Sequence, residues 1–356
     1  MLWIGSFDHP TIGYTQAGLN YLMALLSAGH TDIDLLPLAA FRWDEMPVWA
    51  RPLAAHRAGT TRSPCIIHAP PSTILGIQLS GRPRVGFTVF ETDRIPYWNA
   101  KGLDETTDAM LVASQFNAEG LRAAGYTKPI HVVPHTVGPW WWERKHEKAD
   151  PNTFLFTYIG TWHMRKNPMD VVMAYCAAFP TPVDGRALAL KLSGTQGLEG
   201  RLNELTKGRE DIWIWNESWS ETRIQWLHNQ TDVFVTAHRG EGWGMGPFQA
   251  KLLGRRVIYT NWSAVTEFCT PEDGDLPIDY TLEATPRGLD NLPYFDDPEG
   301  DLLWAKPNFD SLVEAMRTAY AERRPPSEEV ALKMQAKYGW QTVGKQLSEV
   351  VKSLAL

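Results

Sequence analysis

Apolar residues along this chain gather in short runs that alternate with stretches of helical spacing, which is the pattern of an α/β protein. In the first half we predict strands at Leu2–Gly5, Ile33–Leu38, Cys65–His68, Val85–Val89, Asp108–Ala113 and Ile130–Val133. Leucines at helical spacing predict a helix from about Thr15 to Ala28. A further helix follows the fifth strand, with Ser114 as its N-cap and Gly125 as its stop.

The second half starts the alternation again. Its predicted strands are Thr153–Ile159, Ala187–Ser193, Ile212–Trp215, Asp232–Thr236 and Arg256–Tyr259, and its predicted helices are Met169–Phe179, Glu221–Asn229, Phe309–Ala321 and Ser327–Leu356. From Asp273 to Lys306 the chain is rich in Asp, Pro and Gly, and we expect irregular structure.

Two Rossmann-like domains follow from this repetition, because strand-helix-strand units build parallel sheets. Between Thr136 and Asn152, a Gly-Pro pair, three consecutive tryptophans and a run of charges break any period. We place a first domain at residues 1–137, a linker at 138–152 and a second domain at 153–334. A C-terminal helix from about 335 to 356 is expected to pack back on the first domain.

The length supports two domains, since a chain of 356 residues is longer than one hydrophobic core ordinarily accommodates. The 16 tryptophans are unusual, and many lie near predicted loops, where they suit sugar faces, nucleobases or plain packing. A net charge of −7 gives no general affinity for polyanions. One stretch departs from this balance, because no acidic residue occurs between Glu45 and Glu91. Its basic residues are Arg51, His56, Arg57, Arg62, His68, Arg82 and Arg84. The stretch is either a receptor for an anionic molecule or a solvated face.

The expected location is the cytoplasm. Three widely spaced cysteines favour a reducing compartment in which the thiols are packing residues. The chain opens directly into a strand, which leaves no room for a signal peptide. No apolar run approaches the roughly 18 residues of a membrane span.

A glycine-rich loop follows the predicted strand Asp232–Thr236. It contains Gly240, Gly242, Gly244 and Gly246, and it runs into a short helix with Pro247 in the first turn and Gly254 at the end. Such a loop can bring backbone N–H groups close to a phosphate, and the helix dipole favours negative charge there. The alternative is that the glycines serve only the turn.

The residues from Glu241 onward resemble the signature of retaining GT-B glycosyltransferases of the group 1 class (family 4). That signature has a Glu, seven residues, a second Glu, then Ala and a Gly before a strand. Here the matching residues are Glu241–Met245, Pro247, Gln249, Ala250, Gly254 and Val257. Further matches occur in the family's order at Asp108–Ser114 with Gly125, Val132–His135, Phe156–Gly160, Arg165–Asn167, Leu227 and Asp232–Val235. Together they span roughly residues 86 to 270.

The resemblance implies a GT-B fold, with two Rossmann-like domains facing each other across a cleft. It implies transfer of a sugar from a UDP- or GDP-sugar to an acceptor hydroxyl, as in a hexosyltransferase, with retention by a front-face mechanism. By this resemblance Glu241 contacts the donor sugar, while Lys166 and Arg165 neutralise the leaving diphosphate. The resemblance places the ribose of the donor at Gln249, where this chain departs from the family's second Glu. Either the Gln249 amide still hydrogen-bonds the ribose hydroxyls, or the change weakens the affinity for the donor.

The other donor-binding residues also follow from the resemblance. Gly13 approaches the diphosphate, or is a plain helix-start turn, and Asn216, Glu217 and Trp219 are candidates for the base. Thr161 stands where relatives often have an Arg, a role that falls to Arg165. The remaining positions in the donor set are Gly160, Gly244, Met245 and Gly246.

On the acceptor side, Glu91 stands where many relatives have a His. Its carboxylate either orients the acceptor hydroxyl and steadies the developing positive charge, or is a structural partner of Arg94. Residues 41–98 receive the acceptor, and the contact residues we single out are Tyr14, Asp93, Arg94 and Trp98. No Asp-x-Asp motif lies near a strand end, so we expect no metal and no cofactor.

Two questions stay open at this point. The acceptor is either a saccharide or small polyol, or a polyanion such as a lipid phosphate or DNA with hydroxylated bases. The alternative to an enzyme is a non-catalytic nucleotide-sugar-binding protein on a GT-B scaffold, which Gln249 and Glu91 would favour. An epimerase or a phosphorylase fits the pattern less well.

Overall fold

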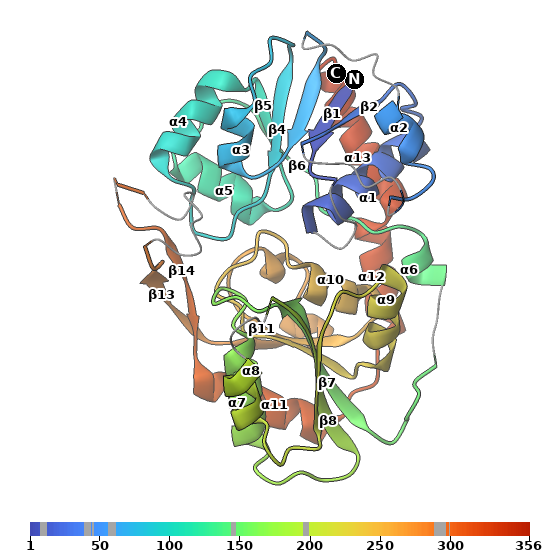
Figure 1. The fold of residues 1–356 in the computed structure, drawn as a ribbon, viewed down its shortest axis with the longest axis vertical. Helices are drawn as coiled ribbons and strands as arrows, with labels where there is room; N and C mark the ends of the chain where they lie inside the picture. Colours follow the sequence, from blue (N-terminus) through green and yellow to red (C-terminus); the bar gives the residue numbers. More distant parts are fainter. Residues whose placement is uncertain are drawn as a thin grey trace. The chain divides into compact units, whose positions relative to one another are not determined.

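The computed structural model describes the chain apart from residues 8–12, 39–43, 45, 56–61, 144–146, 195–198, 288–296 and 299. His56, Arg57 and parts of the predicted acceptor region 41–98 therefore lie outside the described residues. The chain forms two compact units (Figure 1). Unit 1 contains Met1–Pro139, Ala284–Leu303 and Ala336–Leu356, and unit 2 contains Trp140–Glu283 and Trp304–Gln335.

Unit 1 is built on a parallel sheet of six strands in the order β2-β1-β3-β4-β5-β6. The strands are β1 (Leu2–Gly5), β2 (Asp34–Pro37), β3 (Cys65–His68), β4 (Arg84–Thr88), β5 (Ala109–Val112) and β6 (Ile130–Val132). All six predicted strands of the first half are present, with ends shifted by at most one residue.

Helices cover both faces of this sheet. They are α1 (Gly13–Ser27), α2 (Arg51–Ala55), α3 (Pro71–Gly76), α4 (Tyr97–Thr106), α5 (Gln115–Ala123) and α13 (Trp340–Ser353). One core lies between the sheet and α1, α2 and α13, and the other lies between the sheet and α3, α4 and α5. α13 packs along α1 (Figure 1), and a Cβ at Gly344 would lie only 2.5 Å from the carbonyl oxygen of Ala24. The C-terminal helix thus completes the core of unit 1.

Unit 2 has a second parallel sheet of six strands, in the order β12-β11-β10-β7-β8-β9. The strands are β7 (Phe154–Thr161), β8 (Arg186–Ser193), β9 (Ile212–Asn216), β10 (Val233–Thr236), β11 (Arg256–Thr260) and β12 (Leu276–Ile278). The chain builds outward from β7 through β8 to β9, and then returns to the other side of β7 with β10. The order therefore reverses between β7 and β10, which is where open α/β sheets bind ligands.

The elements around this second sheet are α6 (Trp140–Glu143), α7 (Pro168–Ala178), α8 (Glu199–Leu205), α9 (Glu221–Gln230), α10 (Met245–Leu252) and α11 (Phe309–Glu322). Short 3₁₀ turns lie at Ala264–Glu267 and Pro271–Asp273. α7, α8 and α11 contribute to the large core on one face. The opposite face carries a smaller cluster that includes Leu155, Trp219 and Leu227, where α9 packs.

Two predictions about the last third were wrong. The stretch Asp273–Lys306 contains β12 and a separate two-stranded sheet of β13 (Tyr280–Ala284) and β14 (Leu303–Pro307), and residues 284–303 belong to unit 1. The predicted helix Ser327–Leu356 is two helices, α12 (Glu328–Tyr338) and α13. Gly339 separates them with an extended backbone, φ −59° and ψ 143°, because glycine is a weak helix former.

The predicted cap of α5 is confirmed and gives a stability test. The Ser114 hydroxyl accepts a hydrogen bond from the backbone N–H of Asn117 at 3.2 Å, and Gly125 beyond the helix has φ +90°. Ser114→Ala should lower the free energy of unfolding by about 1 kcal/mol, because it leaves a helix N–H without its acceptor. The measurement compares thermal melts of Ser114→Ala and Ser114→Gly with those of the parent protein. Ser114→Gly should lower the free energy of unfolding by only a few tenths of a kcal/mol. Equal melting temperatures for Ser114→Ala and the parent protein would contradict the assignment.

Candidate functional site

Two loops meet at the carboxyl edge of the unit 2 sheet, after the neighbouring strands β7 and β10. The first runs from Trp162 to Asn167 and leads into α7, and the second runs from Ala237 to Gly244 and leads into α10. Both loops follow apolar strands whose residues fill the core, so the change from apolar to polar sequence sets where each strand ends. The polar side chains are thereby delivered to the topological switch point.

Glu241 is the centre of this site. Lys166 Nζ lies 2.6 Å from Oε1 and 2.7 Å from Oε2 of Glu241, and an Arg165 guanidinium nitrogen lies 3.3 Å from Oε2. The Glu241 side chain is 6% exposed, while those of Arg165 and Lys166 are 15% and 26% exposed. Two partly accessible cations therefore share one buried carboxylate.

Charge decides the protonation state of Glu241. Burial by itself would raise the pKa of the carboxyl, but the positive charges of Lys166 and Arg165 outweigh burial and lower the pKa from 4.5 to about 2. The neighbouring His238 is fully buried, and burial lowers its pKa to about 4, so its imidazole is neutral at pH 7. Its Nε2 lies 3.2 Å from the Trp262 carbonyl oxygen, an acceptor, so we place the ring proton there.

Hydrogen bonds hold the two loops together. The Arg165 guanidinium donates to the Gly240 carbonyl at 2.7 Å, and the Arg239 backbone N–H donates to the Arg165 carbonyl at 2.7 Å. Asn167 donates from Nδ2 to the Ala237 carbonyl at 3.1 Å. Asn167 has φ +52°, a left-handed conformation that Asn tolerates better than most residues. The basic pair is thus fixed relative to Glu241 before any ligand binds.

Ser263 supports Glu241 from the far side of the loop. Its hydroxyl accepts a hydrogen bond from the Glu241 N–H at 3.0 Å, and the Ala264 N–H donates to the Glu241 carbonyl at 3.2 Å. Ser263 has φ +66° and ψ −167°, a region that L-residues rarely occupy. A strained residue held by hydrogen bonds to the backbone of a buried, charged residue is typical of functional sites.

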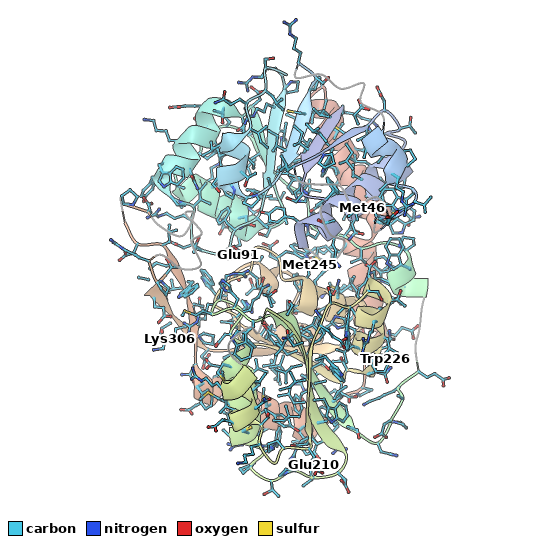
Figure 2. The ribbon with its side chains drawn as sticks, viewed as in Figure 1. Met46, Glu91, Glu210, Trp226, Met245 and Lys306 are labelled. Carbon is cyan, nitrogen blue, oxygen red and sulfur yellow. The ribbon has the colours of Figure 1, made fainter. Side chains whose placement is uncertain are left out.

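The glycines beyond Glu241 do more than turn the chain. Gly244 is the N-cap of α10 and has φ +91°. A residue with a side chain would be strained in this backbone conformation. A Cβ at Gly246, inside the first turn of α10, would lie 2.8 Å from the Phe234 ring and 3.2 Å from the Ile159 carbonyl oxygen. α10 therefore packs closely over the ends of β7 and β10, with Met245 as its first residue (Figure 2). Gln249 is buried one turn later, beside His228 of α9.

The three residues predicted to contact the nucleotide base differ in how exposed they are. Asn216 ends β9 and is exposed, and Glu217 pairs with Arg223 at 3.2 Å, both side chains being half exposed. Trp219 is 3% exposed and packs against Trp215, with ring centroids 5.3 Å apart, while Arg223 lies 3.8 Å over its ring. Both Gly160 and Thr161 are in the last two positions of β7, and Thr161 accepts a hydrogen bond from Ser193 at 3.4 Å.

Unit 1 holds the remaining predicted residues. Gly13 is the first residue of α1. The Tyr14 hydroxyl donates to the Val89 carbonyl at 3.2 Å, and burial, with the charge of Glu91, raises the pKa of its phenol. Glu91 is half-buried just after β4 and is labelled in Figure 2. The tyrosine and the carboxylate therefore belong to one neighbourhood at the carboxyl edge of this sheet.

Asp93 and Arg94 bind the segment 284–303 of the same unit. The Asp93 backbone N–H donates to the Leu303 carbonyl at 2.9 Å, and the Leu303 N–H donates to the Asp93 carboxylate at 2.7 Å. The buried Arg94 pairs with Asp297 at 2.5 Å, so the carboxylate paired with Arg94 is Asp297 rather than Glu91. Trp98 is 41% exposed at the start of α4. An acceptor-binding role for these residues stays a prediction, and Trp98 is the one whose exposure best suits it.

Part of the positive charge in the described residues of the acid-free stretch is buried or paired. Arg84 is buried and donates to the Ile74 carbonyl at 2.7 Å, and His68 is also buried. Arg82 pairs with Asp108 at 3.0 Å. Arg51 donates to the carbonyls of Met46 and Asp44.

Three residues near Glu241 were assigned no role in the site from the sequence: His238, Ser263 and Asn167. Ser263 and Asn167 hold the two loops by hydrogen bonds to the backbone of Glu241 and Ala237. His238 carried one usable signal, because it lies directly after β10, where ligand residues gather. Within the parts of the chain that the structure describes, no three His, Cys, Asp or Glu side chains are grouped to hold a metal ion. None of the described helices is long and apolar enough to cross a membrane.

No protein-family model matches the sequence, and no curated protein does. Solved structures do match. HepE of Anabaena, in crystals with UDP and glucose, has a TM-score of 0.69 at 12% identity, with 99% of each chain covered; it was also crystallised with UDP-glucose. Sucrose-phosphate synthase from Thermosynechococcus elongatus has a TM-score of 0.70 at 13% identity, covering 99% of this chain and 98% of that one.

A UDP-forming trehalose-phosphate synthase from Burkholderia xenovorans matches with a TM-score of 0.57 at 11% identity, covering 82% of this chain and 74% of that one. These neighbours are GT-B glycosyltransferases, and at such identities the likeness concerns the fold. The predicted α/β class with two Rossmann-like sheets is confirmed, and the chain has the GT-B fold.

Proposed function

We propose that this protein is a glycosyltransferase that moves a sugar from a nucleotide diphosphate sugar to an acceptor hydroxyl. The observation that carries the proposal is the cluster of Lys166 and Arg165 on buried Glu241, at the switch point of a GT-B sheet and directly before the glycine turn into α10. Solved proteins of the same fold hold UDP and UDP-glucose, which makes UDP-sugars the first donors to test and GDP-sugars the second.

Each member of the cluster has a distinct part. Glu241 is ionised at any pH near neutrality because its pKa is about 2, so it cannot donate a proton to the leaving group. It can accept hydrogen bonds from donor sugar hydroxyls. Lys166 and Arg165 stabilise the charge that develops on the diphosphate as the bond from the anomeric carbon to the phosphate oxygen breaks. The N–H groups at the start of α10, around Met245 and Gly246, add a partial positive charge for the same phosphates.

Retention by a front-face mechanism follows from the family resemblance and fits these roles. The acceptor oxygen forms its bond to the anomeric carbon on the side that the diphosphate leaves, and the acceptor proton goes to the leaving phosphate oxygen. In this scheme the residues on the donor side need only bind and neutralise, which is what an ionised Glu241 and two cations can do. Metal independence belongs to the same proposal, since the two cations supply the positive charge beside the diphosphate.

Gln249→Glu tests the assignment of the ribose position. We expect donor use to be preserved or improved, because a carboxylate accepts hydrogen bonds from ribose hydroxyls at the position where the resembling family has a glutamate. The measurement is the dissociation constant for UDP and GDP and the KM for the donor. Collapse of donor binding in this variant, with an unchanged melting temperature, would count against placing the ribose at Gln249.

A saccharide or small polyol is the better-supported acceptor. Of the five described basic residues in the acid-free stretch, Arg84 and His68 are buried and Arg82 is paired, which leaves little of the positive surface that a polyanion would need. We expect the KM for the acceptor to change little between 50 and 200 mM salt. A loss of affinity by a factor of about 10³ or more over this range, as multiple phosphate contacts produce, would instead assign a polyanionic acceptor.

Gln249, in place of the family's second glutamate, is the observation that favours the second candidate, a nucleotide-sugar-binding protein without turnover. Calorimetry paired with a product assay separates the two functions. A donor that binds but is never hydrolysed or transferred, across saccharide and polyol acceptors, would favour the binding protein.

A further inference from the structure

Arg239 lies two residues before Glu241, and its side chain is held by two strands outside the loop. The guanidinium pairs with Oε1 of Glu283 in β13, and the same oxygen accepts the indole N–H of Trp304 in β14 at 3.2 Å. The guanidinium carbon also lies 5.5 Å from the centroid of the Trp304 ring. Trp304 is fully buried, and the Arg239 side chain is 17% exposed. We call these three residues the Arg239 clamp.

The backbone of Arg239 is fixed on both sides as well. The Ala305 N–H, next to Trp304 in β14, donates to the Arg239 carbonyl at 2.7 Å. The Arg239 N–H donates to the Arg165 carbonyl, also at 2.7 Å. Arg239 therefore joins β14 to the loop that carries Arg165 and Lys166.

These contacts close a ring around the central cluster. The Arg165 guanidinium donates to the Gly240 carbonyl at 2.7 Å and lies 3.3 Å from the Glu241 carboxylate. A shift of Arg239 would move Gly240 and Glu241 through the chain, and Arg165 through its hydrogen-bonded carbonyl. Cations stabilise a bound anion best when they are held in place before it arrives. The placement of Arg165 and Lys166 therefore depends on Arg239.

The clamp is located where the chain changes units. Glu283 is the last residue of unit 2 before the chain enters unit 1, and Trp304 is the first residue after the chain returns. A two-stranded sheet such as that of β13 and β14 is only marginally stable by itself. The contacts of Arg239 with both strands therefore hold this sheet and the Glu241 loop against each other.

We propose that Arg239 is a positioning residue for the diphosphate of the donor: held by Glu283 and Trp304, it keeps Arg165 and Lys166 where the phosphates bind. The inference rests on the proposed function, because it uses a diphosphate at these two cations. Arg239 acts through the backbone of the two loops, and its own charge is paired with Glu283. Removing its side chain should therefore weaken binding of the phosphates and leave binding of the nucleoside unchanged.

The test measures binding of UDP and of uridine to Arg239→Ala by calorimetry, or of GDP and guanosine if the protein prefers GDP. The two ligands of each pair differ by the diphosphate. We expect the dissociation constant for UDP to rise about threefold to tenfold, the range of one hydrogen bond, and that for uridine to stay the same. The binding stoichiometry reports the folded fraction, so partial unfolding does not imitate this result.

A double-mutant cycle identifies the route of the effect. If Arg239 acts by placing Lys166, then Arg239→Ala should weaken UDP binding less in the Lys166→Ala background than in the parent protein. The same loss in both backgrounds would overturn the inference. Arg239→Lys keeps a positive charge beside Glu283 and should retain part of the affinity for UDP.

Glu322→Gln is the matched control for the clamp. Glu322 belongs to the same unit and pairs with Arg256 at 2.7 Å, and its side chain is 35% exposed, against 37% for Glu283. This variant should leave the dissociation constants of UDP and uridine unchanged. If Arg239→Ala is too unstable to purify, Glu283→Gln decides instead, because it removes the charge of the clamp and keeps an oxygen for the Trp304 indole.

The outcomes separate this inference from the proposed function. Equal weakening of UDP and uridine would mean that the clamp only supports the fold, and no weakening would mean that it does not position the cations. Either result overturns the inference, while a parent protein that binds UDP or GDP leaves the proposed function standing. If the parent protein binds neither, the proposed function fails and the inference fails with it.

Discussion

Replacing Lys166 by alanine is expected to lower kcat/KM for sugar transfer by a factor of about 10² to 10³, the range for removing one preorganised donor to developing charge. Lys166 Nζ lies 2.6 and 2.7 Å from the two oxygens of Glu241, so it is held at the switch point before the diphosphate arrives. Because negative charge grows on the leaving phosphate during the reaction, the lysine acts mainly on the transition state, and kcat should fall with kcat/KM.

The measurement is steady-state release of the nucleoside diphosphate with and without acceptor. Lys333→Ala is the matched control, since that lysine belongs to the same unit and pairs with Asp273 at 2.8 Å on the surface. Lys166→Arg keeps the charge and should lose less than Lys166→Ala. Unchanged transfer and unchanged donor hydrolysis in Lys166→Ala would remove the lysine from the reaction.

Glu241→Gln should lower both activity and stability. The carboxyl pKa is about 2 in the folded protein, against 4.5 for an ordinary glutamate. Since a pKa difference of one corresponds to about 1.4 kcal/mol, the ionised carboxylate contributes about 3 kcal/mol, as an order of magnitude. The pKa is lowered on folding, so this stabilisation is fully present above pH 4.5 and is lost as the pH falls toward 2.

Urea unfolding of the parent protein and of Glu241→Gln measures how much the ionised Glu241 carboxylate stabilises the protein. At pH 7 we expect the free energy of unfolding of Glu241→Gln to be about 3 kcal/mol lower than that of the parent protein. This difference between the two proteins should narrow as the pH falls from 4.5 toward 2, because the protonated glutamate then resembles the glutamine. Equal unfolding midpoints at pH 7 would contradict the ion-pair geometry. On activity, the variant should lose transfer because an amide presents one acceptor oxygen where the carboxylate presents two.

The positions of most strands along the chain and the central residues of the site could be predicted from the sequence, because both are carried by short stretches of residues. Apolar runs mark β7 and β10, and the polar residues that follow them, Lys166 and Glu241, fall at neighbouring strand ends. Gly244 and the Ser114 cap are likewise set by backbone chemistry within a few residues.

Contacts between distant residues could not be predicted in the same way. Arg94 and Asp297 are 203 positions apart, and no periodicity joins them. The charge of Arg84 was visible in the sequence, but its burial beneath α3 was not. β12 was missed because Pro277 argues against a strand; a proline is tolerated there because β12 is at the edge of its sheet.

The most direct test of sugar transfer by this protein is consumption of the donor. The parent protein and Lys166→Ala are incubated with a panel of UDP- and GDP-sugars, with and without saccharide acceptors, and the released nucleoside diphosphate is quantified. We expect the parent protein to consume at least one donor, faster with an acceptor, and Lys166→Ala to consume it at least about 100-fold more slowly. If no donor in the panel is consumed or raises the melting temperature of the parent protein, the protein is not a nucleotide-sugar-dependent transferase.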